Sequence, residues 1–343
     1  MKDINILITG IGGAGFGEQI LKALKMSDLN LFIIGTDITD ICFNKRNVNK
    51  FLVIPSAYDE SYNKVIKELI NSYDIKAIFP GSEPELQYFS NNIEEFKDIY
   101  VGINSNELIK LCSNKFSTYE KLSQLGLSVP KYEKINTIDD CKKIDYFPVI
   151  LKPNTNSGGS AHIYISFDME ELKMFSGYML KHGIDIIAQE YIGDSNNEYT
   201  IGVSSDKNGN ILGSIILKRI INNGLSTNKR AKLNDINIVI SSGISQGEFI
   251  FNDNIKEQAE NIAKKIDSRG PINIQGRVVD GKLLIFEINP RLSGTTSLRA
   301  MVGYNEPANM IKQNILHENV IYNYNNGVVL RSIVENVDMD KSV

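Results

Sequence analysis

Apolar and amphipathic stretches alternate along the first hundred residues of the chain. Apolar runs that predict strands occupy residues 4–8, 31–34, 51–54 and 77–79, and amphipathic runs that predict helices occupy residues 17–26 and 62–73. Strands that alternate with helices are typical of a parallel sheet, because each helix carries the chain back to the start of the next strand. This part of the chain is therefore expected to be a parallel sheet wound with helices.

The pattern changes after a helix predicted at residues 114–126. Gly126 ends this helix, and Pro130 prevents it from resuming. Apolar stretches then follow with few long helices between them, at residues 147–152, 161–165, 186–191, 198–204 and 211–220. Strands joined in this way form mostly antiparallel sheets. At roughly 150 residues per domain, the chain is expected to form about two domains of mixed α/β and α+β class, with a cleft.

A glycine-rich turn, Gly10-Ile11-Gly12-Gly13-Ala14-Gly15, follows the first strand, and Asp37 closes the second. This spacing matches a dinucleotide-binding fingerprint, in which glycines let a pyrophosphate approach a helix N-terminus and the acid holds a ribose hydroxyl. An NAD(P)-dependent oxidoreductase is therefore one hypothesis. The alternative is steric, because any doubly wound domain with a tight first turn needs glycines there.

A hairpin expected at residues 271–291 carries a row of polar residues on each arm, because side chains alternate between the faces of a strand. The polar residues are Asn273, Gln275 and Arg277 on the first arm and Glu287, Asn289 and Arg291 on the second. A two-residue turn at Asp280-Gly281 would put Gln275 and Glu287 on opposite faces. A three-residue loop with a glycine bulge would bring them to the same face, and we predict that loop.

The polar row admits two interpretations. It faces solvent, as one side of many antiparallel sheets does, or it binds a ligand. No lysine occupies the part that would be solvated, and a carboxylate beside two amides offers the hard oxygen ligands that suit Mg²⁺. Nearby arginines suit phosphate. A magnesium–nucleotide site is the sharper hypothesis.

A strand that ends near Lys152 runs into a small polar loop, Asn154-Thr155-Asn156-Ser157-Gly158-Gly159-Ser160-Ala161. A loop of this kind between two strands can act as a flap whose backbone N–H groups close over phosphate oxygens. The alternative is an ordinary exposed hairpin loop. Glu190 and Glu198 follow at the ends of later strands, and each of these acids, taken singly, is equally consistent with solvation.

Taken together and in this order, these segments resemble the ATP-grasp superfamily over nearly the whole chain. The motifs are Asn114-Lys115, Lys152 in Val-Ile-Leu-Lys-Pro, the Ser-Gly-Gly-Ser flap, Gln-Glu-Tyr-Ile, Glu-Tyr-Thr-Ile-Gly-Val, Asn-Ile-Gln, and Phe-Glu-Ile-Asn-Pro-Arg. The last motif and the residues that follow it, up to Ser297, are most similar to the synthetase domains of the carbamoyl phosphate synthetase large subunit and its single-domain relatives.

The resemblance implies a domain organisation. Residues 1–110 would form a Rossmann-like pre-ATP-grasp domain that lines the acceptor-substrate side of the cleft and does not bind NAD. Residues 111–343 would form a two-lobed ATP-grasp module with mostly antiparallel sheets, with a lid lobe at about 130–192 and a C-terminal catalytic lobe at about 193–343.

The resemblance also implies residue roles. ATP would be bound by Lys115, Lys152, the flap residues Ser157, Gly158, Gly159 and Ser160, the backbone of Glu190, Tyr191 and Ile192, and Glu198 at the ribose. Mg²⁺, with Mn²⁺ as a substitute, would be held by Gln275, Glu287 and Asn289. Catalysis would fall to Arg291 and, in a looser alignment, to Lys218 or Arg219. The acceptor pocket would be lined by Gly12, Gly13, Glu83, Glu85, Ser293, Gly294, Thr295 and Arg299. Many relatives have an acid in place of Gln275, although glutamine occurs in the carbamoyl phosphate synthetase branch.

The implied reaction is attack of a substrate carboxylate on the γ-phosphate of ATP, giving an acylphosphate and ADP, followed by attack of an amine to give an amide. Carbamoyl phosphate synthetase-like phosphorylation of bicarbonate or carbamate is an alternative. It is disfavoured because the complete large-subunit route uses two synthetase domains and an ammonia supply. A non-catalytic nucleotide-binding protein is a further alternative, disfavoured because the inferred metal and phosphate groups are all present.

Composition narrows the expected partners. The chain has 37 Lys and Arg against 41 Asp and Glu, so its slightly acidic balance gives no general attraction to nucleic acid. No stretch approaches the roughly 18 apolar residues of a membrane span. Cys42, Cys112 and Cys141 include no C-x-x-C pair and are interpreted as ordinary thiols of a cytoplasmic protein. The expected partners are small-molecule carboxylate and amine substrates, and a homodimer is a compatible assembly.

Overall fold

The structure is a computed structural model that describes residues 3–13, 15–155, 162–221, 225–233 and 236–335. The described residues form two compact units. Within the described residues, the first unit draws on the chain up to Ile103, on Leu292–Ile321 and on the chain from Val329 onwards, and the second draws on Asn104–Arg291 and Tyr322–Val328. The boundaries differ from the predicted division at residues 110 and 111, because two segments that follow residue 291 group with the N-terminal part of the chain.

The first unit is built on a five-stranded sheet with the strand order β3-β2-β1-β4-β5. Its strands are β1 (Ile4–Ile8), β2 (Leu31–Asp37), β3 (Lys50–Val53), β4 (Ala77–Phe79) and β5 (Tyr100–Val101). All neighbouring strands run parallel, as the alternation of strands and helices predicts.

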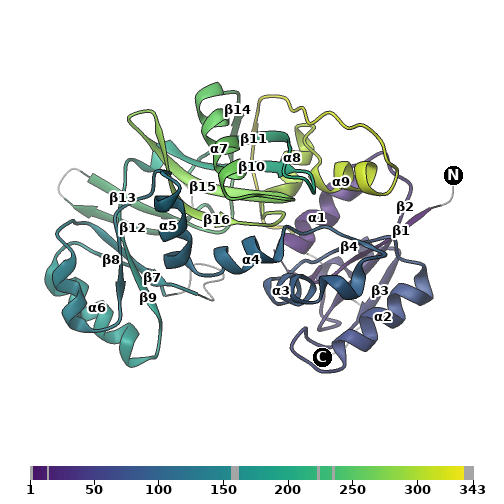
Figure 1. Cartoon of the computed structure of the whole chain (residues 1–343), viewed down its shortest axis with the longest axis horizontal. Helices are drawn as coiled ribbons and strands as arrows, with labels where there is room; N and C mark the ends of the chain where they lie inside the picture. Colours follow the sequence, from purple (N-terminus) through teal and green to yellow (C-terminus); the bar gives the residue numbers. More distant parts are fainter. Residues whose placement is uncertain (1–2, 14, 156–161, 222–224, 234–235, 336–343) are drawn as a thin grey trace. The chain divides into compact units, whose positions relative to one another are not determined.

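Helices cover both faces of this sheet (Figure 1). They are α1 (Phe16–Lys25), α2 (Tyr62–Tyr73), α3 (Glu83–Asn91), α8 (Thr296–Met301) and α9 (Glu306–Asn314). On one face, Ile6 and Ile8 of β1 pack in a cluster with residues of α1 and α9. On the other face, Leu7 packs in a cluster with residues of α2 and α3. The alternation of side chains along β1 thus fills two separate apolar layers.

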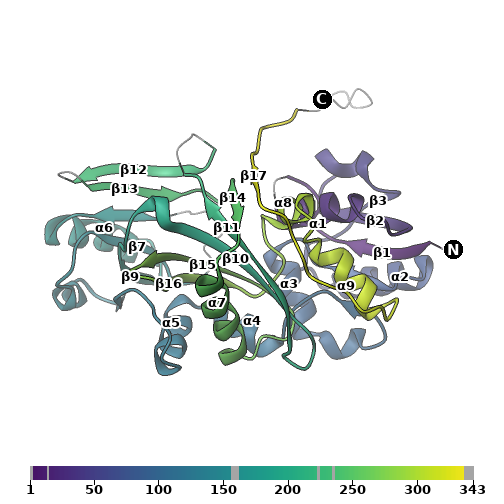
Figure 2. The same cartoon turned by 90° about the horizontal axis from the view of Figure 1, so that it is seen from above.

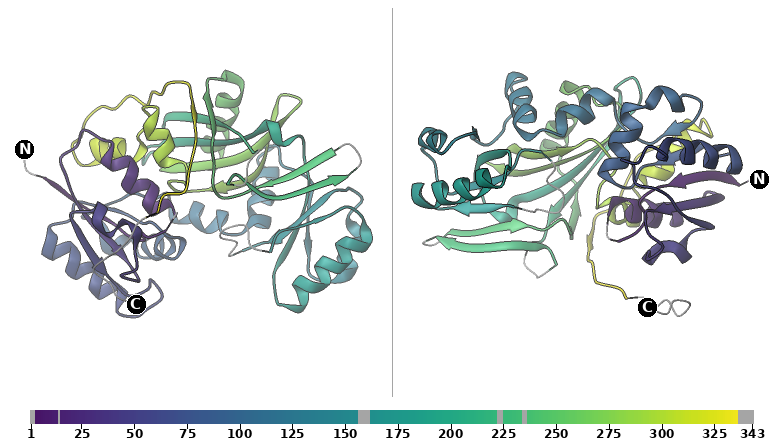
Figure 3. Two further views of the ribbon diagram at one scale, coloured as in Figure 1. Left: turned by 180° about the vertical axis from the view of Figure 1, so that it is seen from behind. Right: turned by 90° about the horizontal axis from the view of Figure 1, so that it is seen from below.

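The second unit contains a four-stranded antiparallel sheet with the order β6-β9-β7-β8. Its strands are β6 (Tyr132–Ile135), β7 (Val149–Pro153), β8 (Tyr164–Ser166) and β9 (Ile186–Glu190). Helix α6 (Met169–Lys181) covers one face of this sheet, where Leu172 and Met179 pack against Leu151 and Ala188 (Figure 3).

A six-stranded sheet with the order β16-β15-β10-β11-β14-β17 forms the rest of the second unit's core. Its strands are β10 (Glu198–Ser205), β11 (Ile211–Arg219), β14 (Gly247–Ile250), β15 (Pro271–Val279), β16 (Lys282–Asn289) and β17 (Gly327–Val329), and its helices are α4 (Asn106–Cys112), α5 (Lys115–Gln124) and α7 (Asp253–Lys265). The pairs β10–β11, β10–β15, β11–β14 and β15–β16 are antiparallel. Ile201, Ile216 and Ile274 pack against Ile255 and Ile262 of α7.

A separate hairpin lies across the other face of this sheet. Its strands, β12 (Thr227–Leu233) and β13 (Ile236–Ser241), pair only with each other within the described chain. Figure 2 shows α7 on one side of the six-stranded sheet and this hairpin on the other. A parallel N-terminal sheet followed by antiparallel sheets confirms the predicted mixed α/β and α+β fold class.

Candidate active site

The predicted polar row lies on one face of the six-stranded sheet. Gln275 of β15 is directly opposite Glu287 of β16, and Asn273 is opposite Asn289. Side chains that pair directly in antiparallel strands point to the same side of a sheet, so these four groups share a face. Gln275, Glu287 and Asn289 are half-buried, so a ligand can reach their oxygens.

The turn that connects the two arms differs from the prediction. Val279 pairs with Lys282, which leaves a two-residue loop of Asp280 and Gly281. Both loop residues have positive φ, 49° and 75°, as a tight hairpin turn of this kind requires. The predicted three-residue loop is therefore wrong, and this turn alone would place the amide and the carboxylate of the row on opposite faces.

A bulge farther along the hairpin restores the alignment. The register shifts between Gln275 and Gly276, so that Gln275 meets Glu287 and Phe286 is left as an extra residue on β16. A side chain at Gly276 does not fit, because its Cβ would lie 2.6 Å from the carbonyl oxygen of Leu284. The predicted shared face is thus confirmed, through a bulge rather than through the turn.

This row offers an oxygen set for a divalent cation. Glu287 supplies a carboxylate, Gln275 and Asn289 supply amide oxygens, and Nη2 of Arg291 lies 3.5 Å from Oδ1 of Asn289. Among the described residues, no group of three or more His, Cys, Asp or Glu side chains is placed to hold a metal ion. A set with one carboxylate fits Mg²⁺ when a bound nucleotide supplies further oxygens, because Mg²⁺ commonly takes one or two protein carboxylates together with substrate phosphates.

Lys152 of β7 lies beside the bulge with its ammonium group enclosed. Its Nζ is 2.6 Å from Oε1 of Gln189, 3.1 Å from the hydroxyl oxygen of Tyr119 and 3.3 Å from the carbonyl oxygen of Phe286. These three acceptors match the three N–H donors of a protonated lysine. Lys152 must therefore exchange one of them to contact a phosphate.

Electrostatics tie the two predicted phosphate-binding lysines to the polar row. Burial and, to a smaller extent, the positive charge of Lys115 lower the pKa of Lys152, the carboxylate of Glu287 acts in the opposite direction, and the resulting pKa is about 7. Lys115 and Glu287 thus both act electrostatically on Lys152, and the three charges together form the region where a polyphosphate and a metal ion could meet.

Helix α5 places Lys115 at its first position. The side chain of Asn114 caps the helix by accepting a hydrogen bond from the N–H of Ser117 at 2.9 Å. Buried Asn154 joins this helix start to the end of β7, because its carbonyl accepts from the N–H of Lys115 at 3.0 Å and its side chain accepts from the N–H of Phe116 at 2.8 Å. The predicted flap residues Ser157, Gly158, Gly159 and Ser160 lie outside the described residues.

The segment Glu190–Ile192 leaves two backbone groups open to a ligand. The N–H groups of Glu190 and Tyr191 donate to backbone carbonyls at 2.9 and 3.0 Å. The carbonyl of Ile192 accepts from Arg277 at 2.9 Å. Within the described chain, the carbonyl of Tyr191 and the N–H of Ile192 have no hydrogen-bond partner. The two groups belong to one trans peptide and point in opposite directions, so one of them at most faces the edge of a base.

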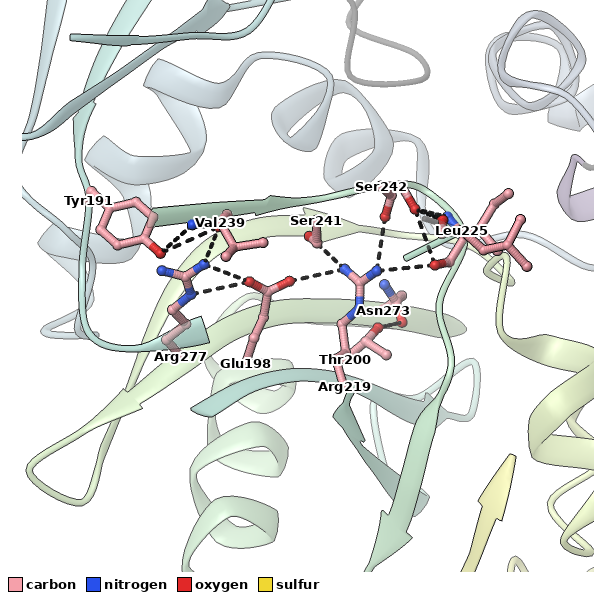
Figure 4. A network of polar contacts seen from close by, with 11 residues as sticks. Tyr191, Glu198, Thr200, Arg219, Leu225, Val239, Ser241, Ser242, Asn273 and Arg277 are labelled. Carbon is pink, nitrogen blue, oxygen red and sulfur yellow. Dashed lines mark hydrogen bonds and ion pairs between the residues drawn. The ribbon is translucent and has the colours of Figure 1, made fainter. Parts of the chain in front are cut away.

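The carboxylate of Glu198 accepts hydrogen bonds from two arginines. It is 1 % exposed, its Oε1 accepts from Nη1 of Arg219 at 3.0 Å, and its Oε2 accepts from Nε and Nη2 of Arg277 at 3.1 and 2.9 Å (Figure 4). A buried carboxylate with both oxygens bound to guanidinium groups has a structural role. The ribose contact of Glu198 stays a prediction.

Lys218 does not share a face with the polar row. Thr200 of β10 pairs with Gln275 on one side and with Leu217 of β11 on the other, so these three side chains point the same way. Because successive residues alternate, Lys218 points to the face covered by α7, and Arg219 points to the polar row. This placement does not favour Lys218, and its catalytic role stays a prediction.

In the first unit, Asp37 braces the glycine loop. Its Oδ2 accepts the N–H of Gly12 at 2.7 Å, and its Oδ1 accepts the N–H of Ile38 at 2.8 Å. A Cβ at Gly12 would lie 2.7 Å from Oδ2, whereas Gly13 is exposed with a φ of 54°. The acid that the fingerprint would assign to a ribose thus holds the loop, which favours the steric interpretation of the glycines.

Glu85 supports the same loop from the inside. It is buried, its Oε2 accepts from Oγ of Ser82 at 2.7 Å, and its Oε1 accepts from the hydroxyl of Tyr62 at 3.3 Å. Burial raises the pKa of Glu85. A Cβ at Gly10 would come within 2.8 Å of Oε2, so the loop rests directly on this carboxyl group. Glu85 is placed as a support rather than as a substrate contact, whereas Glu83 is exposed.

The predicted substrate residues that follow β16 are mostly buried. The hydroxyls of Ser293 and Thr295 are 2.7 Å apart, and Gly294 between them is half-buried. Arg299 is completely buried and forms an ion pair with Glu306 at 2.8 Å. This buried pair indicates a structural role for Arg299, and its substrate contact stays a prediction.

Two residues of the site were not predicted from the sequence. Tyr119 lies one helical turn after Lys115 on α5, and Gln189 directly precedes Glu190. The i, i+4 spacing from a candidate lysine was a usable signal for Tyr119, because it puts both residues on one side of the helix. The contact of Gln189 with Lys152 had no comparable signal, since it depends on which strands become neighbours.

Comparison with known proteins identifies the family. A model described as the ATP-grasp domain matches residues 112–295, which is more than half of the chain, and a model described as the PylC-like N-terminal domain matches residues 6–104. The chain belongs to the ATP-grasp family.

Curated relatives are larger proteins. The carbamoyl phosphate synthase large chain of Clostridium beijerinckii is 22% identical over 305 residues, which are 84% of this chain and 27% of that protein. The C-terminal section of the same large chain from Aquifex aeolicus is 26% identical over 191 residues, which are 54% of this chain and 34% of that protein. The chain thus spans about a quarter to a third of the length of these relatives.

Solved structures share the fold. The L-amino acid ligase from Bacillus licheniformis has a TM-score of 0.64 at 16% identity, over 91% of this chain and 74% of that one. The biotin carboxylase domain dimer of 2-oxoglutarate carboxylase from Hydrogenobacter thermophilus, complexed with MgADP, ADP and bicarbonate, has a TM-score of 0.64 at 17% identity, over 90% and 68%. In the described part of this chain, no helix is long and apolar enough to cross a membrane.

Proposed function

We propose that the protein is a carboxylate–amine ligase that forms an amide through an acylphosphate and releases ADP and phosphate. The observation that carries the proposal is the alignment of Gln275 with Glu287 beside Lys152 and Lys115. Phosphoryl transfer needs charge neutralisation and in-line positioning rather than a covalent protein residue. A row that can hold a metal cation, next to two lysines, supplies the positive charge that such a transfer requires.

The proposed roles follow the chemistry of each group. Glu287, Gln275 and Asn289 hold Mg²⁺, which when bound neutralises charge on the β- and γ-phosphates. Lys115 and Lys152 contact phosphate oxygens, Arg291 stabilises the transferring phosphoryl group, and the backbone of Glu190–Ile192 binds the adenine edge. Of the proposed acceptor-pocket residues, Gly13 and Glu83 are exposed.

Small carboxylates and amines are the proposed substrates. Amino acids are the first compounds to test, because the L-amino acid ligase from Bacillus licheniformis shares the fold over most of this chain. Phosphorylation of bicarbonate is the second candidate function. It is favoured by the similarity to carbamoyl phosphate synthase large chains and by the bicarbonate bound in the related biotin carboxylase domain.

We also propose a cytoplasmic homodimer. Cys42, Cys112 and Cys141 are free thiols in the structure, which suits a reducing compartment. The dimer is proposed by analogy with the biotin carboxylase domain of the Hydrogenobacter protein. Sedimentation of the purified chain at several concentrations tests this assembly.

One experiment tests the reaction. The protein is incubated with Mg²⁺ and ATP together with pools of amino acids, sugar acids and amines, and separately with bicarbonate, and the nucleotide product is identified. Substrate-dependent ADP and phosphate are expected with a carboxylate pool. ADP formed with bicarbonate alone would favour the second candidate, AMP with pyrophosphate would exclude an acylphosphate, and tight binding of NADH would revive an oxidoreductase.

A further inference from the structure

Asn154 follows β7 directly and lies two positions beyond Lys152. It is completely buried and belongs to no helix or strand. Both of its backbone polar groups and both polar atoms of its side-chain amide form hydrogen bonds, and the partners lie on two other segments of the chain. Buried polar groups are stable only when they are paired in this way. Asn154 therefore fixes the positions of those two segments relative to the end of β7.

Two of these contacts hold the start of helix α5. The carbonyl of Asn154 accepts the N–H of Lys115 at 3.0 Å, and its side-chain oxygen accepts the N–H of Phe116 at 2.8 Å. The side chain of Asn114 accepts the next N–H, that of Ser117, at 2.9 Å. The first three N–H groups of the helix, which cannot be paired within the helix, are thereby used. Lys115 consequently offers a phosphate its ammonium group rather than its N–H.

The other two contacts hold Asn154 itself in place. Its N–H donates to the carbonyl of Asp185 at 2.8 Å, and its side-chain nitrogen donates to Oδ2 of Asp185 at 2.7 Å. Oδ1 of the same carboxylate forms an ion pair with Lys134 at 3.3 Å. A carboxylate only accepts and a backbone N–H only donates, so the amide has one possible orientation, with its nitrogen towards Asp185 and its oxygen towards α5.

A further contact joins the same helix to the same strand. Tyr119 lies one turn after Lys115 on α5, and its hydroxyl oxygen is 3.1 Å from Nζ of Lys152. Helix α5 is thus joined to β7 at its start and again one turn later, and two such points determine how the helix is rotated about its axis. The direction in which the side chain of Lys115 leaves the helix follows from that rotation.

We propose that Asn154 is a positioning residue of the nucleotide site, which holds Lys115 beside Lys152 so that one polyphosphate reaches both ammonium groups. This inference rests on the proposed function, in which both lysines contact ATP. Asn154 touches no ligand and acts by holding the start of α5 at the end of β7. A displacement of that start by about 1 Å would weaken the phosphate contact of Lys115, because hydrogen bonds depend steeply on distance and angle.

Dissociation constants for Mg–ATP, measured by titration calorimetry on the full chain, test this role. Asn154→Ala is expected to bind Mg–ATP about tenfold more weakly than wild type, the size of one hydrogen bond to a charged group. Lys115→Met should lose at least as much affinity. In the Lys115→Met background, Asn154→Ala should change the affinity by no more than about twofold, because a residue that acts through Lys115 then has no ammonium group to position.

Asn104→Ala is the matched control. Asn104 is also a buried asparagine that joins the start of a helix, α4, to a distant segment. Its side-chain oxygen accepts the N–H groups of Ser105 and Arg269, both at 2.9 Å, and its side-chain nitrogen donates to Oγ of Ser268 at 3.0 Å. This variant should lower the unfolding temperature about as much as Asn154→Ala, but its affinity for Mg–ATP should stay within about twofold of wild type.

An exchange of the two side chains carries the test if Asn154→Ala does not fold. Asn154→Asp alone puts a second carboxylate against that of Asp185 and should weaken Mg–ATP binding. Asn154→Asp together with Asp185→Asn restores a donor opposite an acceptor and keeps an acceptor for the N–H of Phe116, so it should recover most of the affinity. Thermal unfolding establishes which variants are folded.

Four outcomes would overturn the proposal. They are wild-type affinity in a folded Asn154→Ala protein, an equal loss of affinity in Asn104→Ala, a loss that persists in full in the Lys115→Met background, and an exchange that recovers no affinity. A wild-type protein that does not bind Mg–ATP, or a Lys115→Met protein that binds it normally, would instead refute the nucleotide site of the proposed function.

Discussion

Gln275 and Glu287 face each other across β15 and β16 although a two-residue turn closes the hairpin between them. Their alignment depends on one extra residue, Phe286. Its carbonyl oxygen lies 2.6 Å from the hydroxyl of Tyr119 and 3.3 Å from Nζ of Lys152. The lysine of the phosphate cluster and the bulge that aligns the metal row are therefore parts of one hydrogen-bonded arrangement.

A second carboxylate in the row should couple stability to Mg²⁺. Gln275→Glu places a like charge directly opposite Glu287, which repels across the strand pair without metal and strengthens a cation site with it. We expect a lower unfolding temperature than wild type in EDTA, a larger rise on adding Mg²⁺, and half-saturation at ~10-fold less Mg²⁺. Glu287→Gln should weaken Mg²⁺ binding instead. Equal Mg²⁺ responses in both variants would rule out this row as the metal site.

Gly276 should be required for the register of the row. In Gly276→Ala the new Cβ meets the carbonyl of Leu284, so the bulge must shift, and we expect a loss of about 1–3 kcal/mol in the free energy of unfolding together with weaker Mg–ATP binding. Gly177→Ala is the control. Its Cβ would have only Ile138 at 3.6 Å, and alanine stabilises a helix interior by about 0.5–1 kcal/mol. Urea unfolding and calorimetry measure both effects, and normal nucleotide binding by Gly276→Ala would count against the bulge.

Binding of ATP should be accompanied by proton uptake at Lys152. With a pKa of about 7, this lysine is mostly neutral at pH 8 in the free protein, and a bound triphosphate raises its pKa. We expect uptake of about one proton per ATP at pH 8. Calorimetry in two buffers with different ionisation heats measures the number of protons taken up. The variant Lys152→Met should lack this uptake. Uptake that persists in this variant would assign the proton to another group.

The same pKa predicts how stability depends on pH without nucleotide. The pKa of Lys152 is about 7 in the folded protein and near the ordinary lysine value of 10.5 in the unfolded chain. Between these values the unfolded chain binds more protons, so the contribution of Lys152 makes the free energy of unfolding rise with pH. Lys152→Met should lack this part of the slope in urea titrations between pH 7 and 10.

Arg299 should matter for stability. Replacing it by methionine leaves the buried carboxylate of Glu306 without its partner, which typically costs about 3–5 kcal/mol in the free energy of unfolding. The double variant Arg299→Met with Glu306→Leu removes both charges and should recover much of the loss. Urea unfolding distinguishes the cases. A stable single variant with only a raised KM would restore Arg299 to the substrate pocket.

Local patterns determined a large part of this molecule. The alternation of apolar and amphipathic runs was enough to predict the parallel sheet of the first unit, because strand and helix periods are properties of neighbouring residues. The order of the ATP-grasp motifs was enough to identify the family. The polar rows of the 271–291 hairpin followed from strand alternation, which is also local.

Long-range packing decided the rest. The bulge at Phe286, the face of Lys218 and the two arginines on Glu198 all depend on which strands become neighbours and in what register. The burial of Arg299 depends on helices α8 and α9, which belong to the first unit although they follow residue 291 in sequence. A sequence determines which way each side chain alternates, but only tertiary pairing determines what it meets, because register and burial arise from contacts between residues far apart in the chain.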